Sequence, residues 1–333
     1  MRVLAGDVGG TKTALAIVEV GPRRCRVLRI ERYRSAEYGR LEDIVADFLS
    51  TEASRPLAAG FGVAGPVRDG RSKITNLPWR LDERRLEHST RMRRVTLVND
   101  FGANALGLRF LGPRQTATLA RGRPERSGPI ALLGAGTGLG QAALLRSGGT
   151  ETVVSSEAGH VDFGPRTALE DRLAAFLRGR FGRATRERIL SGSGLVLLYE
   201  FLERDGFARP GRAAEAALRD ADDRAEVISH LGLARKDRLC RGALELFVAI
   251  YGSEAGNLAL WYRATGGVYV AGGIAPKILP ALRAPAFLRA FHDKPPMKPL
   301  LAAIPVRVVL DPRLGLYGAA AAAARVARRP TAG

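Results

Sequence analysis

A glycine-rich turn near the N-terminus offers groups that could hold a phosphate. The sequence GDVGGTKT begins at Gly6 and separates two apolar runs. Glycine permits positive φ angles and close backbone approach, so N–H groups at Gly6, Gly9 and Gly10 can converge on an anion. Thr11 adds a hydroxyl donor, and Asp7 could hold Mg²⁺ through water because hard cations prefer oxygen ligands. Taken alone, the turn is explained equally well by a tight hairpin.

Two further glycine turns occur later in the chain. GAGTGLG offers Gly136, Gly138 and the Thr137 hydroxyl, and the pair Gly272–Gly273 follows a β-rich run. Three such turns, two of them similar, favour anion binding over unrelated hairpins. The chain has no GxxxxGK[ST] sequence, and GAGTGLG has its third glycine at the wrong offset for a dinucleotide fingerprint. Its continuation, QAALLR, predicts a strand where that fingerprint requires a helix.

A candidate catalytic carboxylate follows a predicted strand. VND places Asn99 and Asp100 at the carboxyl end of that strand, where open α/β sheets bind ligands. A carboxylate there can accept a proton from a substrate hydroxyl as it attacks phosphorus. The alternative is that Asp100 caps the following helix, FGANALG. The residues alone leave both interpretations open.

The segment SSEAGHVDFGP gathers Glu157, His160 and Asp162 around a glycine. The Glu–Ala–Gly–His pattern is not a metal pair in itself, and its carboxylate and imidazole suit hydrogen bonds to neighbouring hydroxyl groups of a ligand. A polar loop without a ligand is the alternative explanation.

Three other polar or aromatic residues are weaker candidates. Glu187, in ATRERILSG, lies in a helical pattern and would ordinarily belong to a solvated helix face. Asn76 and Trp79, in TNLPW, could line a cleft or form a turn with a buried tryptophan.

The elements expected to carry these residues alternate between strands and helices. Apolar runs bounded by turn residues predict strands at 3–5, 14–20, 25–30, 57–63 and 95–98, and a helix at 41–50. This pattern indicates an α/β fold. Residues 167–264 are mainly helical in pattern, with 240–264 the longest candidate helix. The chain ends in a strand and an alanine-rich helix, and we expect the tail from Arg328 to fray.

The opening pattern returns later in the chain. VLAGDVGGTKTALAIV places an apolar run, a glycine turn and a second apolar run in sequence, and IALLGAGTGLGQAALL does the same about 130 residues later. Two similar strand–turn–strand units predict a duplicated architecture.

Composition excludes several classes of protein. The two cysteines, Cys25 and Cys240, are far apart and lack a neighbouring Cys/His cluster, which argues against a disulfide framework and a cysteine-based zinc site. No apolar run approaches the ~20 residues that span a bilayer, and the apolar stretch at the N-terminus is too short for a signal peptide. We therefore expect a cytoplasmic protein that does not bind a membrane.

The formal charge of +19 has two interpretations. Such a balance could mark a nucleic-acid binder, but the basic residues are spread along the chain and lack the interleaved aromatics of a single-strand groove. We expect a solvated, arginine-rich surface and no nucleic-acid partner. A positive field would also attract an anionic nucleotide, so charge alone does not decide.

Together the motifs resemble the bacterial glucokinases of the actin-like ATPase (hexokinase) superfamily, in family order over nearly the whole chain. The residues that carry this resemblance are GDVGGTK at 6–12, VNDF at 98–101, GAGTGLG at 134–140, EAGHVDF at 157–163, RILSGSGL at 188–195 and AGGI at 271–274. One glycine turn is weak evidence, whereas six motifs in order are strong.

The resemblance implies a two-domain, duplicated ribonuclease-H-like α/β fold, with ATP and glucose in an interdomain cleft. The small domain would comprise residues 1–110 plus 301–333, and the large domain residues 111–300. Mg–ATP would phosphorylate the 6-hydroxyl of glucose, and a homodimer is suggested.

The resemblance also assigns roles to matched residues. By motif match, Asp100 is the expected catalytic base, and Asn99, Glu157, His160 and Glu187 are the expected sugar ligands. The first two glycine turns would hold the phosphates of ATP, with Gly272–Gly273 near its adenosine.

Two departures from the family pattern bear on which hexose is preferred, and less on the prediction of phosphoryl transfer. Lys12 stands where the family usually has Asn after GGT, and Ala158 replaces the glycine of the more usual EGGH. GGTK is more familiar in the related ROK sugar kinases, but their CxCGxxGC zinc cluster cannot form with two isolated cysteines.

Three alternatives follow. A kinase of mannose, fructose or an N-acetylhexosamine would present similar motifs. A sugar-responsive transcription regulator of the same fold would carry an N-terminal DNA-binding segment, for which a phosphate turn starting at Gly6 leaves no room. A nicotinamide dehydrogenase is disfavoured by the failed fingerprint.

Overall fold

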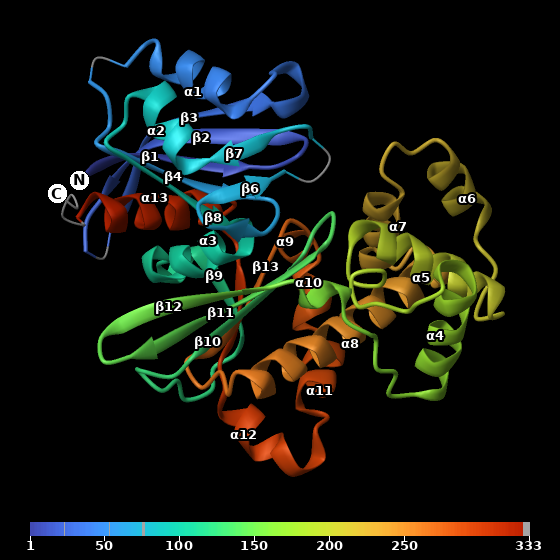
Figure 1. The fold of residues 1–333 in the computed structure, drawn as a ribbon. Coiled ribbons are helices and arrows are strands. Elements are labelled where there is room, and N and C mark those ends of the chain that lie inside the picture. Colours follow the sequence, from blue (N-terminus) through green and yellow to red (C-terminus); the bar gives the residue numbers. More distant parts are fainter. Residues whose placement is uncertain (23, 53, 75–76, 329–333) are drawn as a thin grey trace. The chain divides into compact units, whose positions relative to one another are not determined.

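The computed structural model describes residues 1–22, 24–52, 54–74 and 77–328, which fold into two compact units (Figure 1). Unit 1 contains Met1–Gln115, Val153–Ser155 and Asp311–Gly333, and unit 2 contains Thr116–Thr152 and Ser156–Leu310. These boundaries differ from a division at residue 301, because a strand at Val306–Val309 hydrogen-bonds into the sheet of unit 2. Asn76 and the tail beyond Arg328 lie outside the described residues.

The main sheet of unit 1 has the strand order β3-β2-β1-β4-β8. Its strands are β1 (Arg2–Val8), β2 (Lys12–Val20), β3 (Cys25–Arg34), β4 (Ala58–Val63) and β8 (Arg94–Asn99). The first three pair antiparallel, and β4 and β8 run parallel to β1. The five strands expected from the sequence are confirmed, and β3 continues to Arg34.

Helices cover both faces of this sheet, which explains why its central strands are apolar along most of their length. Leu4 and Val8 of β1 pack on the side of α1, whereas Val3 and Ala5 pack on the side of α13 (Figure 1). The helices of unit 1 are α1 (Leu41–Leu49), α2 (Glu83–Thr90), α3 (Asp100–Gly107) and α13 (Leu314–Ala327). The helix expected at 41–50 is therefore confirmed.

A small second sheet in unit 1 has no counterpart among the sequence predictions. It consists of β5 (Val67–Arg68), β6 (Arg71–Lys73) and β7 (Arg80–Asp82). Asp69 and Gly70 connect the first two strands with φ angles of 51° and 71°. Positive φ at both central residues matches the twist of a two-residue hairpin. Short, charged strands hide this hairpin from an analysis based on apolar runs.

The sheet of unit 2 repeats the order of the first, as β12-β11-β10-β13-β14, and adds β9 at one edge. Its strands are β9 (Thr116–Ala120), β10 (Ile130–Ala135), β11 (Leu139–Ser147), β12 (Thr150–Ser156), β13 (Gly267–Ala271) and β14 (Val306–Val309). Three residues of β12, Val153–Ser155, are grouped with unit 1. Here too the hairpin β10–β11 is antiparallel, and β13 runs parallel to β10. The duplication predicted from the two similar sequences is confirmed.

Nine helices carry most of the remainder of unit 2 among its described residues. They are α4 (Ala168–Phe181), α5 (Gly192–Arg204), α6 (Arg212–Arg219), α7 (Arg224–Leu233), α8 (Arg238–Trp261), α9 (Ile274–Lys277), α10 (Leu279–Arg283), α11 (Pro285–His292) and α12 (Lys298–Ala303). The longest, α8, starts before residue 240 because the Asp237 carboxylate caps it, accepting the Cys240 N–H at 2.7 Å.

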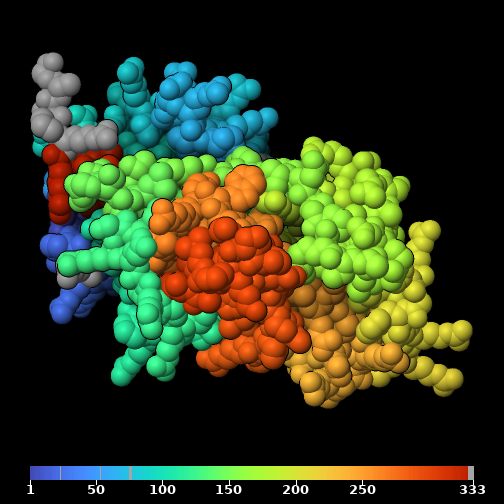
Figure 2. Space-filling model, turned by 90° about the horizontal axis from the view of Figure 1, so that it is seen from below, coloured from blue at the N-terminus to red at the C-terminus, as the bar shows by residue number. Residues whose placement is uncertain are grey.

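Helix α8 is enclosed by other parts of unit 2. Helix α11 packs along it, and the orange-red atoms of this part of the chain lie at the centre of the face seen in Figure 2. Short 3₁₀ turns at Ser35–Glu37, Leu108–Phe110, Pro113–Gln115, Ala158–His160 and Pro295–Met297 connect the larger elements. Within the described ranges, no helix has the length and apolarity needed to cross a bilayer.

Glycines allow α13 to lie directly on α3 and β4. A Cβ atom on Gly318 would stand 1.6 Å from the Ala103 carbonyl oxygen, and one on Gly60 would stand 2.1 Å from the Ala319 carbonyl oxygen. Both contacts are with backbone, which cannot rotate away as a flexible side chain can. The C-terminal helix is thereby fixed against the elements that carry the active-site candidates of unit 1.

We predict that Gly318→Ala lowers the free energy of unfolding by about 3 kcal/mol, because α13 must move away from α3. The control, Gly179→Ala in α4, adds a Cβ with no atom within 4 Å and should raise stability by about 0.5–1 kcal/mol through helix propensity. Urea unfolding followed by circular dichroism measures both. A loss below about 1 kcal/mol for Gly318→Ala would contradict the close packing.

Candidate active site

In unit 1, three parallel strands end side by side. Val8 of β1 pairs with Val63 of β4, which pairs with Asn99 of β8. The Gly9 turn follows the first of these strands, and Asp100 follows the third. The register therefore brings both candidate features to the same edge of one sheet, where α/β folds bind ligands.

The first glycine turn is held in place by Ser35. The Gly9 N–H donates to the Lys12 carbonyl at 3.0 Å, closing the turn. Ser35 donates its N–H to the Thr11 carbonyl at 3.1 Å and its hydroxyl to the Gly9 carbonyl at 2.8 Å. The carbonyls are thus satisfied within the protein, while Gly10 is half-buried and Thr11 is exposed. This leaves the turn suited to present donors to an anion.

Gly6 has a different position from the other glycines of its motif. It lies inside β1, where a Cβ atom would stand 2.3 Å from the Phe61 ring. The structure thus accounts for this glycine by core packing.

The Asp7 carboxylate lies close to the start of α13. A Cβ atom on Gly315 would be 3.2 Å from Asp7 Oδ2. Desolvation by the surrounding protein raises the pKa of the Asp7 carboxyl above its usual range, although the residue as a whole is exposed, so water screens part of this effect. A nearby cation would reverse this effect. Because no three His, Cys, Asp or Glu side chains cluster as a metal site in the described part of the chain, a single carboxylate fits Mg²⁺ that keeps most of its waters.

The sequence left open whether Asp100 is a helix cap or a catalytic carboxylate, and the structure gives the cap role to Asn99. Asn99 is the helix cap: its Oδ1 accepts the Gly102 N–H at 3.1 Å, and its Nδ2 donates to the Gly65 carbonyl at 3.2 Å. Asp100 is the first residue of α3, and its Oδ1 accepts the Phe101 N–H at 2.8 Å. The residue that caps α3 is therefore Asn99 and not Asp100. Asp100 is half-buried at the edge of the sheet.

In unit 2, the other two glycine turns lie next to each other. Gly134 of β10 pairs with Ala271 of β13, so the turns at Gly136 and Gly272 leave adjacent parallel strands. Gly272 has a φ of 82°, and a Cβ there would stand 2.3 Å from the Ala135 carbonyl oxygen. Only glycine fits this approach without strain. Gly136, Gly138 and the pair Gly272–Gly273 thus form one glycine-rich edge, with Thr137 and Gly273 exposed.

The N-terminus of α5 adds polar groups that are not among the candidate residues predicted from the sequence. The Gly192 N–H donates to the Gly136 carbonyl at 2.9 Å, which joins the helix to the second glycine turn. Ser191 caps the helix by accepting the Gly194 N–H at 3.0 Å. A helix N-terminus beside a glycine turn favours an anion. The capping serine in RILSGSGL was the available sequence signal.

Glu187 does not lie in a helix, contrary to its sequence pattern. It occupies a turn that is tied to neighbouring segments, since its N–H donates to the Gly159 carbonyl at 2.8 Å. Its Oε2 accepts the Leu139 N–H at 3.0 Å, and its Oε1 lies 3.7 Å from His160 Nδ1. A Cβ on Gly138 would be 2.5 Å from Glu187 Oε2. The glycine turn and this carboxylate are therefore in direct contact.

Glu157 and His160 stand at the two ends of a single 3₁₀ turn. The His160 N–H donates to the Glu157 carbonyl at 3.0 Å, and both side chains are exposed. Asp162 lies apart from the pair and forms an ion pair with Arg183 at 2.6 Å. The structure thus brings together Glu157, His160 and Glu187, and it buries Trp79 in the core of unit 1.

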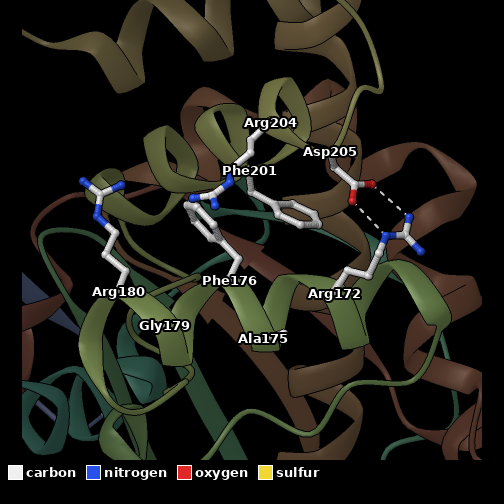
Figure 3. Close-up of a pocket in the computed structure, with 8 residues that line it drawn as sticks. All are labelled: Arg172, Ala175, Phe176, Gly179, Arg180, Phe201, Arg204 and Asp205. Carbon is white, nitrogen blue, oxygen red and sulfur yellow. Dashed lines mark hydrogen bonds and ion pairs between the residues drawn. The ribbon is translucent and has the colours of Figure 1, made fainter.

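The cavity in Figure 3 lies elsewhere in unit 2, between α4 and α5, and has a volume of about 770 Å³. Figure 3 shows Phe176 and Phe201 between the helices, with arginines around them. Arg172 is already paired with Asp205 at 2.8 Å, and Arg180 pairs with Glu200 at 2.7 Å. This cavity holds none of the candidate residues, so we do not assign it to the reaction.

Comparison with known proteins identifies the family. The family model described as Glucokinase matches residues 4–326. The chain belongs to the glucokinase family. It is 40% identical to a glucokinase of Nostoc punctiforme over 97% of this chain and 99% of that protein.

Solved structures agree with this membership. A glucokinase from an Antarctic psychrotroph has a TM-score of 0.86 and 28% identity, covering 97% of this chain and 99% of its own. A ROK family glucokinase from Streptomyces griseus, solved with glucose and AMPPNP, has a TM-score of 0.65 and 21% identity, covering 98% and 100%. The second likeness shows the fold alone. The fold is the two-domain actin-like ATPase fold, as expected.

We predict that Asp7→Asn raises the melting temperature of the ligand-free protein at pH 7. A raised pKa means that Asp7 contributes stability below its unfolded pKa, about 3.9, and loses that contribution as pH rises through its folded pKa. The gain from Asn should therefore vanish near pH 3.5. Differential scanning fluorimetry at both pH values measures it.

The control for this prediction is Asp43→Asn, which removes an exposed carboxylate of α1 that pairs with Arg40. It should shift the melting temperature little at either pH. A lower melting temperature for Asp7→Asn at pH 7 would show that the charge at Asp7 is stabilised rather than disfavoured.

Proposed function

We propose that this chain transfers the γ-phosphoryl group of ATP to the 6-hydroxyl of glucose. The observation that carries the proposal is the match to the Glucokinase family over residues 4–326. It is supported by 40% identity to a glucokinase along almost the full length of both chains. The Streptomyces griseus glucokinase of the same fold was solved with glucose and an ATP analogue.

Asp100 is the general base in this proposal. As the glucose O6 attacks the γ-phosphorus, the O6–P bond forms, the bond between the β–γ bridging oxygen and that phosphorus breaks, and ADP leaves. The proton of the 6-hydroxyl passes to the Asp100 carboxylate. Its position supports this role, because the start of α3 holds the carboxylate at the sheet edge and its Oδ1 is oriented by the Phe101 N–H. General-base assistance contributes about 10²–10⁴-fold.

The sugar ligands are Asn99, Glu157, His160 and Glu187. Ionised carboxylates accept hydrogen bonds from sugar hydroxyls, and such charge-assisted bonds are the stronger ones. Glu187 Oε1 lies 3.7 Å from His160 Nδ1, so the two side chains are close enough to bond neighbouring hydroxyls of one sugar ring. Asn99 already caps α3, so the second hydrogen on its Nδ2 is what it has to offer a ligand.

The glycine turns hold the nucleotide. The Gly10 N–H and the Thr11 hydroxyl bind phosphate oxygens, and Gly9 closes this turn through its own N–H. The Thr137 hydroxyl and the Gly138 N–H bind phosphate oxygens beside the N-terminus of α5, where the Gly136 N–H donates to the Gly138 carbonyl at 2.9 Å. Gly272–Gly273 leave room for the adenosine, because no Cβ atoms obstruct this edge. Asp7 would hold Mg²⁺ through water, and the ion would neutralise charge on the phosphates. As the family implies, we place the protein in the cytoplasm as a homodimer.

The test of the reaction is ADP formation by the purified protein with Mg–ATP and one hexose at a time. We expect strong turnover with glucose and weak turnover with mannose, fructose and N-acetylglucosamine, because the sugar ligands bond hydroxyls whose positions differ among these sugars. Faster turnover with another hexose would show that this hexose, and not glucose, is the preferred substrate. No turnover with any of them would favour a sugar-binding regulator.

We predict that Asp100→Asn lowers kcat by at least about 100-fold while the glucose KM stays within about threefold. Asparagine keeps the shape of the side chain and cannot accept the proton. The control is Asp171→Asn, which removes a carboxylate from the first turn of α4 and so matches the helix-terminus effect. Turnover of Asp100→Asn within about threefold of wild type would remove the base assignment.

A further inference from the structure

The turn that carries Glu187 is fastened on two sides. On one side, Glu187 Oε2 accepts the N–H of Leu139 in β11 at 3.0 Å. On the other, the neighbouring Arg186 donates through Nη1 to Glu254 Oε1 at 2.6 Å. Glu254 belongs to the long helix α8. The position of this turn is thus set jointly by a strand and by a helix that is distant in sequence.

The same helix carboxylate also holds β11. Gln141, two residues after Leu139, donates its Nε2 to Glu254 Oε1 at 2.8 Å. Asn257 completes the arrangement by donating to Glu254 Oε2 at 3.0 Å. Glu254 therefore connects Arg186 to the strand whose backbone holds Glu187.

The backbone transmits this anchoring to Glu187. The Arg186 N–H donates to the Val161 carbonyl at 3.1 Å, and the Arg186 carbonyl accepts the N–H groups of Ile189 and Leu190 at 3.1 and 2.8 Å. Arg186 is thus bonded through its side chain and both backbone groups. A displacement of Arg186 must move the adjacent carboxylate.

The ion pair between Arg186 and Glu254 is largely buried, so both charges lose contact with water. The Glu254 side chain is 4% exposed and that of Arg186 14% exposed. Burial raises the pKa of Glu254, while Arg186 and the two amides favour its charged form. A buried ion pair adds little net stability compared with apolar residues of similar volume. Its presence beside a ligand-binding turn is better explained by the geometry that it imposes.

We propose that Glu254 and Gln141 are positioning residues for the sugar: acting through Arg186, they fix the Glu187 carboxylate where it bonds glucose. This inference rests on the proposed role of Glu187 as a sugar ligand. It concerns the affinity for sugar, because Arg186 and Glu254 bond each other and the proposed function assigns neither of them to ATP or to the reacting oxygen.

The first experiment compares Glu254→Gln with Glu170→Gln. Glu170 forms a matched pair with Arg166 at 2.7 Å, with side chains 2% and 20% exposed, at the start of α4. We expect Glu254→Gln to raise the glucose KM about tenfold, the effect of weakening one charge-assisted hydrogen bond. The ATP KM and kcat should stay within about twofold, and Glu170→Gln should leave all three unchanged. Equal behaviour of the two variants would overturn the inference.

A double-mutant cycle tests whether Glu254 acts through Glu187. In the Glu187→Gln background, Glu254→Gln should have little further effect on the glucose KM, since the carboxylate to be positioned is gone. Multiplying effects would show that Glu254 acts independently and would overturn the inference.

A milder variant keeps the inference testable if Glu254→Gln does not fold. Gln141→Met preserves the ion pair and removes only the amide donor, so we expect a glucose KM about threefold above wild type with kcat unchanged. No change would remove Gln141 and the strand link from the proposal. Absence of glucose turnover in the wild-type protein would instead refute the proposed function itself.

Discussion

The hydrogen-bonded register of parallel strands is the constraint on which the candidate site depends. Val8, Val63 and Asn99 are paired across three strands of unit 1. The residues that follow them must then emerge at one edge, even though the Gly9 turn and Asp100 are separated by about 90 residues in sequence. Changing the register by one residue would turn each side chain to the opposite face. The geometry of the candidate site in unit 1 is therefore set by the register of the sheet.

The same strand order in unit 2 supports a different set of groups. Its parallel strands β10 and β13 end in two adjacent glycine turns, and Leu139 at the start of β11 donates its N–H to the Glu187 carboxylate. One architecture used twice thus carries the proposed base and one glycine turn in unit 1, and two further glycine turns with three of the proposed sugar ligands in unit 2. The glycines differ in purpose: Gly6 and Gly318 permit close packing, whereas Gly136 has open space around it.

Much of this could be predicted from the sequence because local patterns determined it. The strands around both glycine turns are apolar runs, and their similarity predicted the repeat. The hairpin at Asp69–Gly70 also had a local signal, an Asp-Gly pair, but its strands are too short and charged for the apolar pattern to show them.

Long-range contacts explain what the sequence did not show. Glu187 lies in a helical pattern, yet its segment is a turn, because contacts with Gly159, Val161 and Leu139 override local propensity. The pair Arg186–Glu254 joins residues 68 positions apart, and no local spacing identifies it. Asn99 was expected to bind ligand, and only the structure shows that it also caps α3.

The formal charge of +19 reflects an arginine-rich surface. Many arginines form ion pairs at the surface, among them Arg172 with Asp205 and Arg180 with Glu200. Exposed pairs contribute little to stability. The excess positive charge attracts anions in general, so it does not identify a particular partner.

The position of the transferred phosphate tests the central claim most directly. The protein would be incubated with Mg–ATP and glucose labelled with ¹³C at C6, and the product examined by ¹³C and ³¹P NMR. The account predicts a phosphate monoester coupled to the labelled C6, formed together with ADP. Phosphate on another carbon, or inorganic phosphate with unchanged glucose, would contradict it.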